Sequence, residues 1–113
     1  MRFKDKIVLI TGSAGGIGFK TALDFGNEGA IVAVTDIDFE MAKKLSNQII
    51  SSGGIAEPLQ LDVTNLEQTK DVFEVLNQKY GVCDIVFCNA GIREITPMLD
   101  LEFEDWKKVI DVN

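Results

Sequence analysis

The stretch Thr11–Gly18 reads TGSAGGIG, with glycine at four of its eight positions, and it directly follows the apolar run Ile7–Ile10. Such a run is typical of a strand buried on both faces of a parallel sheet. Helical periodicity begins at Gly16, so the chain has to turn sharply here, and glycine permits the positive φ angles of such a turn. Small residues also expose the first amides of the helix, which attract phosphate. A turn that serves only helix packing would need glycine too, and the cluster alone leaves both interpretations open.

Strand and helix patterns alternate through the rest of the chain. We expect strands at 7–10, 31–34, 57–61 and 84–88, and helices at 16–28, 38–50, 64–80 and from about residue 102 onward. Strands joined by helices in this order require right-handed parallel crossovers, which predicts an α/β protein with a doubly wound parallel sheet. A stretch of 113 residues has the usual length of one domain, and no repeat or linker divides residues 1–113.

Two helix starts carry capping signals. Asp38 has the position of an N-cap, and Thr64–Glu67 has the form of a capping box with Thr64 as its first residue. The periodicity also predicts which helical side chains face the core. These are Ile17, Ala22, Phe25, Met41, Ala42, Leu45, Ile49, Val72, Phe73, Leu76, Tyr80, Phe103, Trp106, Val109 and Ile110, with Asn113 on the last of these stripes.

The composition excludes several kinds of partner. With 46% hydrophobic and 26% charged residues the chain is an ordinary globular protein, and its net charge is -7. Nucleic acid and anionic membranes both require a basic surface, so neither is expected as the main partner. The apolar run after Lys6 is too short for a signal sequence or a membrane span.

The two cysteines, Cys83 and Cys88, flank a predicted strand and should point to opposite faces. We therefore expect two buried free thiols, as in a protein of the reducing cytoplasm. The chain has no histidine and no Cys-x-x-Cys pair, so no metal site is predicted.

Asp36 follows the second predicted strand. A carboxylate at this place can accept hydrogen bonds from both ribose hydroxyls of an adenosine, and it repels a 2′-phosphate. Alone it could be an ordinary solvated loop acid, but its place beyond the glycine stretch, at the carboxyl edge of the sheet, favours a ligand. No lysine or arginine lies in residues 11–18 or 35–40 to accommodate an extra phosphate, so NAD is favoured over NADP.

Two further motifs end predicted strands. Asp62-Val63 ends the third strand, where the carboxylate could accept the adenine amino group or could simply help to cap the helix near Thr64. Asn89-Ala90-Gly91 follows the fourth strand, where small residues let a flat ligand approach and the Asn89 amide can tie strand ends together. An ordinary strand-to-loop turn explains the second motif equally well.

Taken together, these motifs resemble the short-chain dehydrogenase/reductase family. The matching elements run in order from Lys4 to Asn113: Thr11-Gly12-x-x-x-Gly16-Ile17-Gly18, Asp36, Asp62-Val63, Asn89-Ala90-Gly91 and Asp111-Val112-Asn113. The resemblance implies a dinucleotide-binding, Rossmann-type fold with strand order 3-2-1-4 across residues 1–113. It further implies hydride transfer between a nicotinamide cofactor and an alcohol or carbonyl substrate.

The resemblance also assigns roles by position. The residues assigned to the pyrophosphate and adenosine ribose are Gly12, Ser13, Ala14, Gly15, Gly16 and Ile17. Asp36 and Ile37 would bracket that ribose and the adenine, and Asp62 with Val63 would meet the adenine. The segment Asn89-Ala90-Gly91 would border the nicotinamide ribose. Asn113 matches a catalytic asparagine whose main chain holds a water in a proton relay.

The chain departs from the family pattern in two ways. Cys88 stands where the family often has asparagine, which is a mild change within a strand. The catalytic serine and the Tyr-x-x-x-Lys motif of the family lie beyond Asn113, and the only tyrosine, Tyr80, has Asp84 four residues later instead of lysine. We therefore expect the 113 residues alone to bind NAD without turnover.

Three origins remain open for such a chain: the front part of a longer enzyme, which we favour, a natural truncation, or a binding module completed by a partner. With the order 3-2-1-4 the fourth strand is an apolar edge, and such an edge invites pairing. We therefore expect a homo-oligomer or another partner to cover it.

Overall fold

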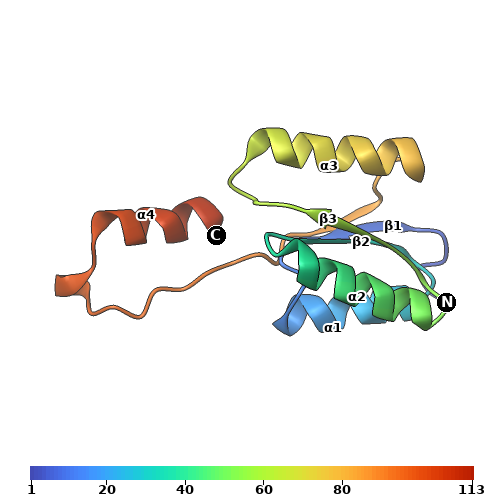
Figure 1. Ribbon diagram of the computed structural model, residues 1–113, viewed down its shortest axis with the longest axis horizontal. Helices are drawn as coiled ribbons and strands as arrows, with labels where there is room; N and C mark the ends of the chain where they lie inside the picture. Colours follow the sequence, from blue (N-terminus) through green and yellow to red (C-terminus); the bar gives the residue numbers. More distant parts are fainter.

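The carboxyl ends of four parallel strands meet at one edge of a single sheet. The computed structural model describes all residues from Met1 to Asn113. Its strands are β1 (Ile7–Ile10), β2 (Ile31–Asp36), β3 (Ile55–Gln60) and β4 (Ile85–Phe87). They pair in parallel in the order β3-β2-β1-β4 (Figure 1). The predicted α/β class and the predicted strand order are confirmed.

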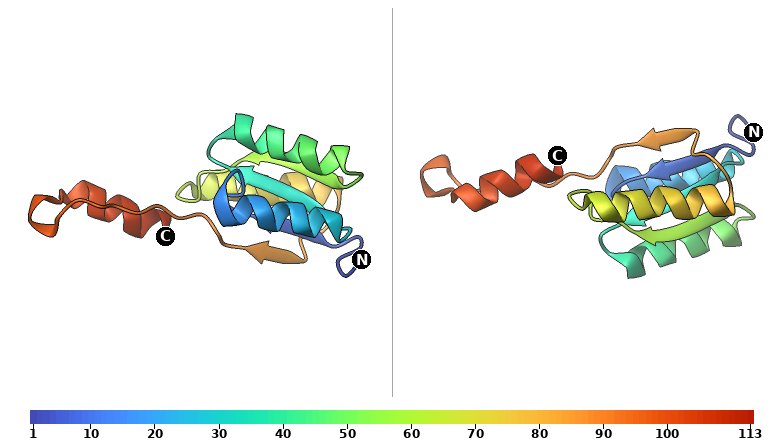
Figure 2. Two further views of the ribbon diagram at one scale, coloured as in Figure 1. Left: turned by 90° about the horizontal axis from the view of Figure 1, so that it is seen from below. Right: turned by 90° about the horizontal axis from the view of Figure 1, so that it is seen from above.

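Helices cover both faces of the sheet. Helices α1 (Gly16–Asn27) and α2 (Phe39–Ser51) lie on one face, and α3 (Leu66–Lys79) lies on the other (Figures 1 and 2). A short 3₁₀ turn, η1 (Met98–Asp100), and helix α4 (Phe103–Val112) stand beyond the carboxyl edge of the sheet. The molecule is therefore elongated, with extents of 50 × 26 × 24 Å.

The sheet divides the core into two layers. Successive residues of a strand point to opposite faces, so Val8 and Ile10 pack on the side of α1 and α2 while Leu9 packs on the side of α3. Leu45 and Ile49 of α2 complete the first layer. All four residues of β1 are buried, which explains why its sequence is continuously apolar.

Several helical side chains lie elsewhere than the periodicity predicts. Ile17 is 74% exposed, because the first turn of α1 projects past the end of the sheet. Met41 and Phe73 are also not buried, with 40% and 36% exposure, and each lies one position away from the stripe that its helix buries. The buried residues of α2 are Ala42, Leu45, Ser46 and Ile49, and those of α3 are Val72 and Leu76.

One of the two predicted caps is correct. The Asp38 carboxylate accepts a hydrogen bond from the Met41 amide at 3.2 Å. The cap of α3 is Asn65 and not Thr64, since the Asn65 Oδ1 accepts from the Gln68 amide at 3.0 Å. The Thr64 hydroxyl instead donates to Asp62, which leaves the capping position to its neighbour.

No residue of α4 is buried, so the predicted inward stripe of this helix is wrong. Phe103 and Trp106 stack with ring centroids 5.7 Å apart, yet Trp106 remains 50% exposed. Ile110 and Asn113 are exposed as well. The helix lies outside the sheet layers, and its pattern predicts a buried face that has nothing to pack against in these 113 residues (Figure 1).

The edge of the sheet at β4 matches the prediction, with Val86 at 47% exposure. The two free cysteines beside it differ in environment. Cys83 is partly buried, and this burial raises the pKa of its thiol. Cys88 is exposed because β4 ends at Phe87, so the prediction of two buried thiols holds only in part. None of the helices is long and apolar enough to cross a lipid bilayer.

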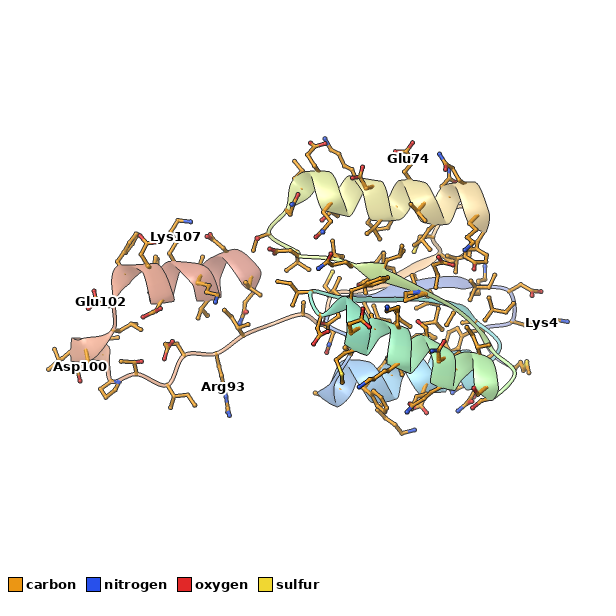
Figure 3. All side chains as sticks on the ribbon, in the orientation of Figure 1. Lys4, Glu74, Arg93, Asp100, Glu102 and Lys107 are labelled. Carbon is orange, nitrogen blue, oxygen red and sulfur yellow. The ribbon has the colours of Figure 1, made fainter.

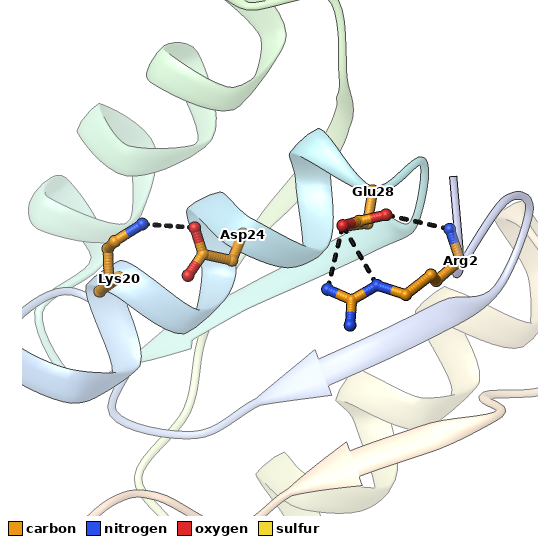
Figure 4. A network of polar contacts seen from close by, with 4 residues as sticks. All are labelled: Arg2, Lys20, Asp24 and Glu28. Atoms are coloured by element: carbon orange, nitrogen blue, oxygen red, sulfur yellow. Dashed lines mark hydrogen bonds and ion pairs between the residues drawn. The ribbon is translucent and has the colours of Figure 1, made fainter.

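Two ion pairs lie along the outer surface of α1 and at its C-terminal end (Figure 4). Arg2 binds the two oxygens of Glu28, with its backbone amide 3.0 Å from Oε2 and its Nη2 3.0 Å from Oε1. These hydrogen bonds lower the pKa of the Glu28 carboxyl. One turn earlier, Lys20 pairs with Asp24. The N-terminal segment is thereby held against the end of α1, before β1 begins.

Replacing Ser46 with alanine should stabilise the fold by about 1 kcal/mol, because its buried hydroxyl has no hydrogen-bond partner. Urea unfolding of both proteins measures this difference. Ser51→Ala, in the same helix but exposed, controls for helix propensity. An equal gain in both variants would contradict the explanation.

The carboxylate of Asp84 predicts a pH-dependent contribution to stability. It accepts from the Ile7 amide at 2.9 Å and from Lys6 Nζ at 3.0 Å, and these bonds lower its pKa in the folded state. A lowered carboxyl pKa stabilises the fold above the pKa of the unfolded chain, and this stability disappears as pH falls through the folded pKa. Asp84→Asn should therefore lower Tm at neutral pH and converge with the parent at acid pH, whereas the exposed Asp71→Asn should not.

Candidate functional site

A cleft of about 520 Å³ opens at the carboxyl edge of the sheet. The predicted site residues that line it are Gly12, Gly15, Asp36, Ile37, Asp62, Val63, Asn89, Ala90 and Gly91. They come from the ends of all four strands, so the fold gathers motifs that are far apart in the sequence. The cleft also has four lining residues to which the sequence assigns no binding role: Leu61, Ile92, Lys108 and Val112.

Two glycines of the loop before α1 are required by close packing. A Cβ at Gly18 would lie 2.5 Å from both the Asn89 Nδ2 and the Gly12 carbonyl oxygen. A Cβ at Gly12 would lie 2.8 Å from the Cα of Ala90, and the φ of +60° at Gly12 already disfavours a side chain. These two positions let the first helix approach the end of β4.

The other two glycines face open space. A Cβ at Gly15 or Gly16 would meet no atom within 4 Å. Gly16 still needs to be glycine because its φ is +57°. Gly15 has φ -156° and ψ 166°, an extended conformation that any residue can adopt. Neither conformation nor packing therefore explains glycine at position 15, whereas a ligand that approaches the backbone here would.

The first amides of α1 have no hydrogen-bond partner from residue 15 to residue 18. Gly15 is the N-cap, and it has no side chain that could cap the helix. Helices α2 and α3 both have a capping side chain at this place. Helix α1 thus presents unpaired donors and the positive end of its dipole beside the cleft.

Ser13 and Ala14 lie beneath the surface of the loop. Ser13 is fully buried, and both its amide and its hydroxyl donate to the Thr35 carbonyl oxygen at 3.0 Å. Ala14 donates its amide to Asp36. Both residues support the loop from below, and in this structure they have no donor left for direct contact with a ligand.

The side chains of Thr11 and Asn89 join the ends of β1 and β4. The Thr11 hydroxyl accepts from the amides of Asn89 and Ala90, at 3.0 and 2.9 Å. In return, the Asn89 Nδ2 donates to the carbonyl oxygens of Thr11 and Gly12, at 3.1 and 3.0 Å. The expectation that this amide ties neighbouring strand ends together is confirmed.

Asp36 connects the end of β2 to the glycine loop. Its Oδ2 accepts from the Ala14 amide at 3.1 Å, and its Oδ1 accepts from the Asp38 amide at 2.9 Å. Each oxygen has further lone pairs, so these bonds orient the carboxylate and leave capacity for more donors. Ile37, the next residue, is exposed and provides an apolar side to the cleft.

Asp62 has one of the two roles that the sequence leaves open, the role at the start of α3. Its Oδ1 accepts from the amide and the hydroxyl of Thr64, at 2.9 and 2.6 Å, which shapes the turn before α3. These bonds lower the pKa of the Asp62 carboxyl, so it is ionised at neutral pH. The residue and its neighbour Val63 also line the cleft. The helix-entry role is therefore present, and the ligand role remains a prediction.

Asn113 lies outside the cleft but holds one of its walls. Its Oδ1 accepts from the Ile92 amide at 2.8 Å, and its Nδ2 donates to the Ile92 carbonyl oxygen at 2.9 Å. This two-point contact fixes the segment after Gly91 against the end of α4. The side chain is exposed, not directed into a core as the helical stripe predicts, because α4 turns this face toward the loop.

Lys108 and Val112 reach the cleft from α4, at positions four residues apart on the same side of that helix. The sequence does not predict their place in the cleft, because a helical stripe predicts burial and gives no sign that the helix passes over a strand edge. The position of Val112 directly before Asn113 is the only sequence signal that points to this wall. No cluster of three or more His, Cys, Asp or Glu side chains is arranged to hold a metal ion.

Comparison with known proteins gives a consistent result. The family model described as short chain dehydrogenase matches residues 6–113. The 3-oxoacyl-acyl-carrier-protein reductase FabG of Thermotoga maritima is 42% identical over 113 residues, which are 100% of this chain and 46% of that protein. The cyclohexanol dehydrogenase of Acinetobacter sp. strain SE19 is 37% identical over 113 residues, 99% of this chain and 45% of that protein.

A solved structure extends the likeness to the fold. A short-chain type dehydrogenase/reductase from Mycobacterium marinum superposes with a TM-score of 0.92 at 35% identity, over 96% of this chain and 43% of that one. The chain thus spans about half the length of these three relatives.

The junction between β1 and β4 predicts a large effect of one hydroxyl. Thr11→Val keeps the shape of the side chain but removes the acceptor of two amides, and it should lower the free energy of unfolding by about 2 kcal/mol. Thr11→Ser keeps the hydroxyl and should lose less than half as much. Urea unfolding checks both variants, and equal losses would show that the methyl group matters instead.

Proposed function

Because the chain belongs to the short-chain dehydrogenase family, we propose that its cleft binds a nicotinamide dinucleotide as the cofactor of an oxidoreductase. The observation that carries the proposal is the row of unpaired amides at residues 15–18, where neither backbone strain nor packing requires the glycine at position 15. An anion is the natural partner of such a helix end. The pyrophosphate of the dinucleotide supplies one.

The residues present fit such a cofactor. Gly15, Gly16 and Ile17 would hold the pyrophosphate by their backbone amides, while Gly12 allows the loop to lie close to Ala90. Ser13 and Ala14 would support this seat from below. When bound, the nicotinamide ring exchanges a hydride with a substrate carbon. The protein's part is to bind and orient that ring.

We propose NAD over NADP as the cofactor. The Asp36 carboxylate is held in place by two amides and would accept hydrogen bonds from the hydroxyls of the adenosine ribose. A 2′-phosphate at the same place would meet its negative charge. Ile37 and Val63 provide apolar contact for the adenine, and Asp62 provides an ionised acceptor for its amino group.

The nicotinamide end would lie along Asn89, Ala90 and Gly91, which the joint to Thr11 fixes at the end of β4. Asn113 is proposed to take part in catalysis by holding this wall through Ile92 and by offering its main chain to a water of the proton relay. An alcohol or carbonyl compound is the proposed substrate class, in keeping with the names of two relatives.

A binding module without turnover is the alternative for these 113 residues. The only tyrosine, Tyr80, donates its hydroxyl to Glu57 at 3.0 Å and does not line the cleft. Burial and the hydrogen bond to Glu57 raise its pKa, which makes it a weaker proton donor. A tyrosine that exchanges a proton with an alcohol would have to come from outside residues 1–113.

Binding is tested most simply by crowding the proposed pyrophosphate seat. Gly15→Val leaves the backbone unstrained but fills the space above the amides, so the Kd for NAD should rise at least about ten-fold, or 1.4 kcal/mol. Isothermal titration calorimetry with NAD measures this change in Kd.

Ser51→Val is the control, because Ser51 is exposed at the end of α2, at the amino edge of the sheet, and does not line the cleft. It should bind NAD like the parent. Unchanged affinity in Gly15→Val, with circular dichroism showing a folded protein, would reject the seat. No binding of NAD or NADP to the parent would reject the proposed function itself.

A further inference from the structure

The cleft has one cationic side chain, and it comes from α4. Among the thirteen lining residues, Lys108 is the only lysine or arginine, and Asp36 and Asp62 are the only carboxylates. The segments on either side of the Asp36 position contain no cation, so the sequence near the ribose site predicts a purely acidic environment. The fold changes this by bringing Lys108 across from a helix that begins more than sixty residues later.

Lys108 lies at the adenosine end of the cleft. A second hollow of about 430 Å³ adjoins the cleft between α4 and the turn before α3. Four residues line both spaces and so form the wall between them: Ile37, Asp62, Lys108 and Val112. Ile37 directly follows Asp36, and Asp62 is the expected contact of adenine. The lysine is thus grouped with the residues proposed to hold the base and its ribose.

The ammonium of Lys108 is not engaged in an ion pair or hydrogen bond within the protein. Hydrogen bonds from Thr96 and Ile95 lower the pKa of the Glu94 carboxyl, and the charge of Lys108 adds to this effect, so Glu94 is its charged neighbour on the segment before α4. The adjacent Lys107 pairs with Asp111 at 2.5 Å, lines the second hollow only, and points away from the segment that leads to α4 (Figure 3). Lys108 lines the same cleft as Asp36 and Asp62 but forms neither an ion pair nor a hydrogen bond with them. Arg93, on that segment, points away from α4 and does not line the cleft (Figure 3).

An unpaired lysine is a mobile point charge that binds phosphate without demanding a fixed geometry. The pyrophosphate already has the amides of residues 15–18. The other phosphate that a nicotinamide dinucleotide can carry at the adenosine end is the 2′-phosphate of the ribose that Asp36 faces. Asp36 opposes that group by charge, and Lys108 attracts it, more strongly in a partly enclosed site than in open water.

We propose that Lys108 is a specificity-determining residue that receives a 2′-phosphate. The choice between NAD and NADP then depends on the balance between repulsion of that phosphate by Asp36 and its attraction by Lys108. This rests on the proposed function. While Asp36 is present, its negative charge excludes NADP. Once that charge is removed, Lys108 allows the cleft to bind NADP. Binding of NAD, which has no 2′-phosphate, does not depend on Lys108.

Four proteins test the proposal by titration with NAD and NADP: the parent, Asp36→Asn, Lys108→Gln and the double variant. Asp36→Asn keeps an oxygen that can accept from the Ala14 amide, and it should strengthen NADP binding about ten-fold. Adding Lys108→Gln to it should weaken NADP binding about three- to ten-fold and NAD binding less than two-fold. Raising the salt concentration should remove most of this NADP difference.

Lys107→Gln in the Asp36→Asn background is the control, since it removes an adjacent charge of α4 that does not line the cleft, and it should leave both affinities unchanged. An equal loss for NAD and NADP in the double variant would overturn the proposal and place Lys108 on the pyrophosphate. An NADP affinity that does not change between Asp36→Asn and the double variant would overturn it as well. If the parent binds neither dinucleotide, the proposed function fails first, and the two failures are thus distinguished.

Discussion

The fold places the side-chain amide of Asn89 where three pieces of chain meet, and the cleft depends on this junction. The amide donates to the carbonyl oxygens of Thr11 and Gly12, and there is no room beside it for any side chain at Gly18. The Thr11 hydroxyl closes the joint from the other side. Because β1, β4 and the start of α1 are locked together, the glycine loop has one position relative to the sheet edge.

This fixed position turns an uncapped helix end into a binding surface. The amides at residues 15–18 cannot pair with the protein, and the residues that could have covered them are small. Asp36 accepts a hydrogen bond from one amide of the loop, lines the cleft and has lone pairs left for further donors. Helix α4 closes the opposite wall and is itself held by the contact of Asn113 with Ile92. Donors, an acceptor and a cation thus converge from separate elements.

Much of this arrangement could be predicted from the sequence, because parallel strands must end at a common edge. The alternating strand and helix patterns predict the fold class. The same patterns place Asp36, Asp62 and Asn89 at strand ends. Which side chains of a helix are buried is harder to predict from the sequence. Ile17 and Met41 are exposed because the tertiary packing does not cover the turn or face on which each lies. Lys108 could not be predicted, because nothing local marks a helix that returns over a distant strand.

The central claim is that the unpaired amides at the start of α1 bind the diphosphate of the cofactor. Amide chemical shifts of the isotope-labelled chain, recorded while NAD is added, test it at each position separately. The account predicts that the largest changes occur at Gly15, Gly16 and Ile17, and that Gly53 and Gly81, which are glycines of distant turns, do not shift. Saturable binding that moves other signals and leaves those three amides in place would contradict it.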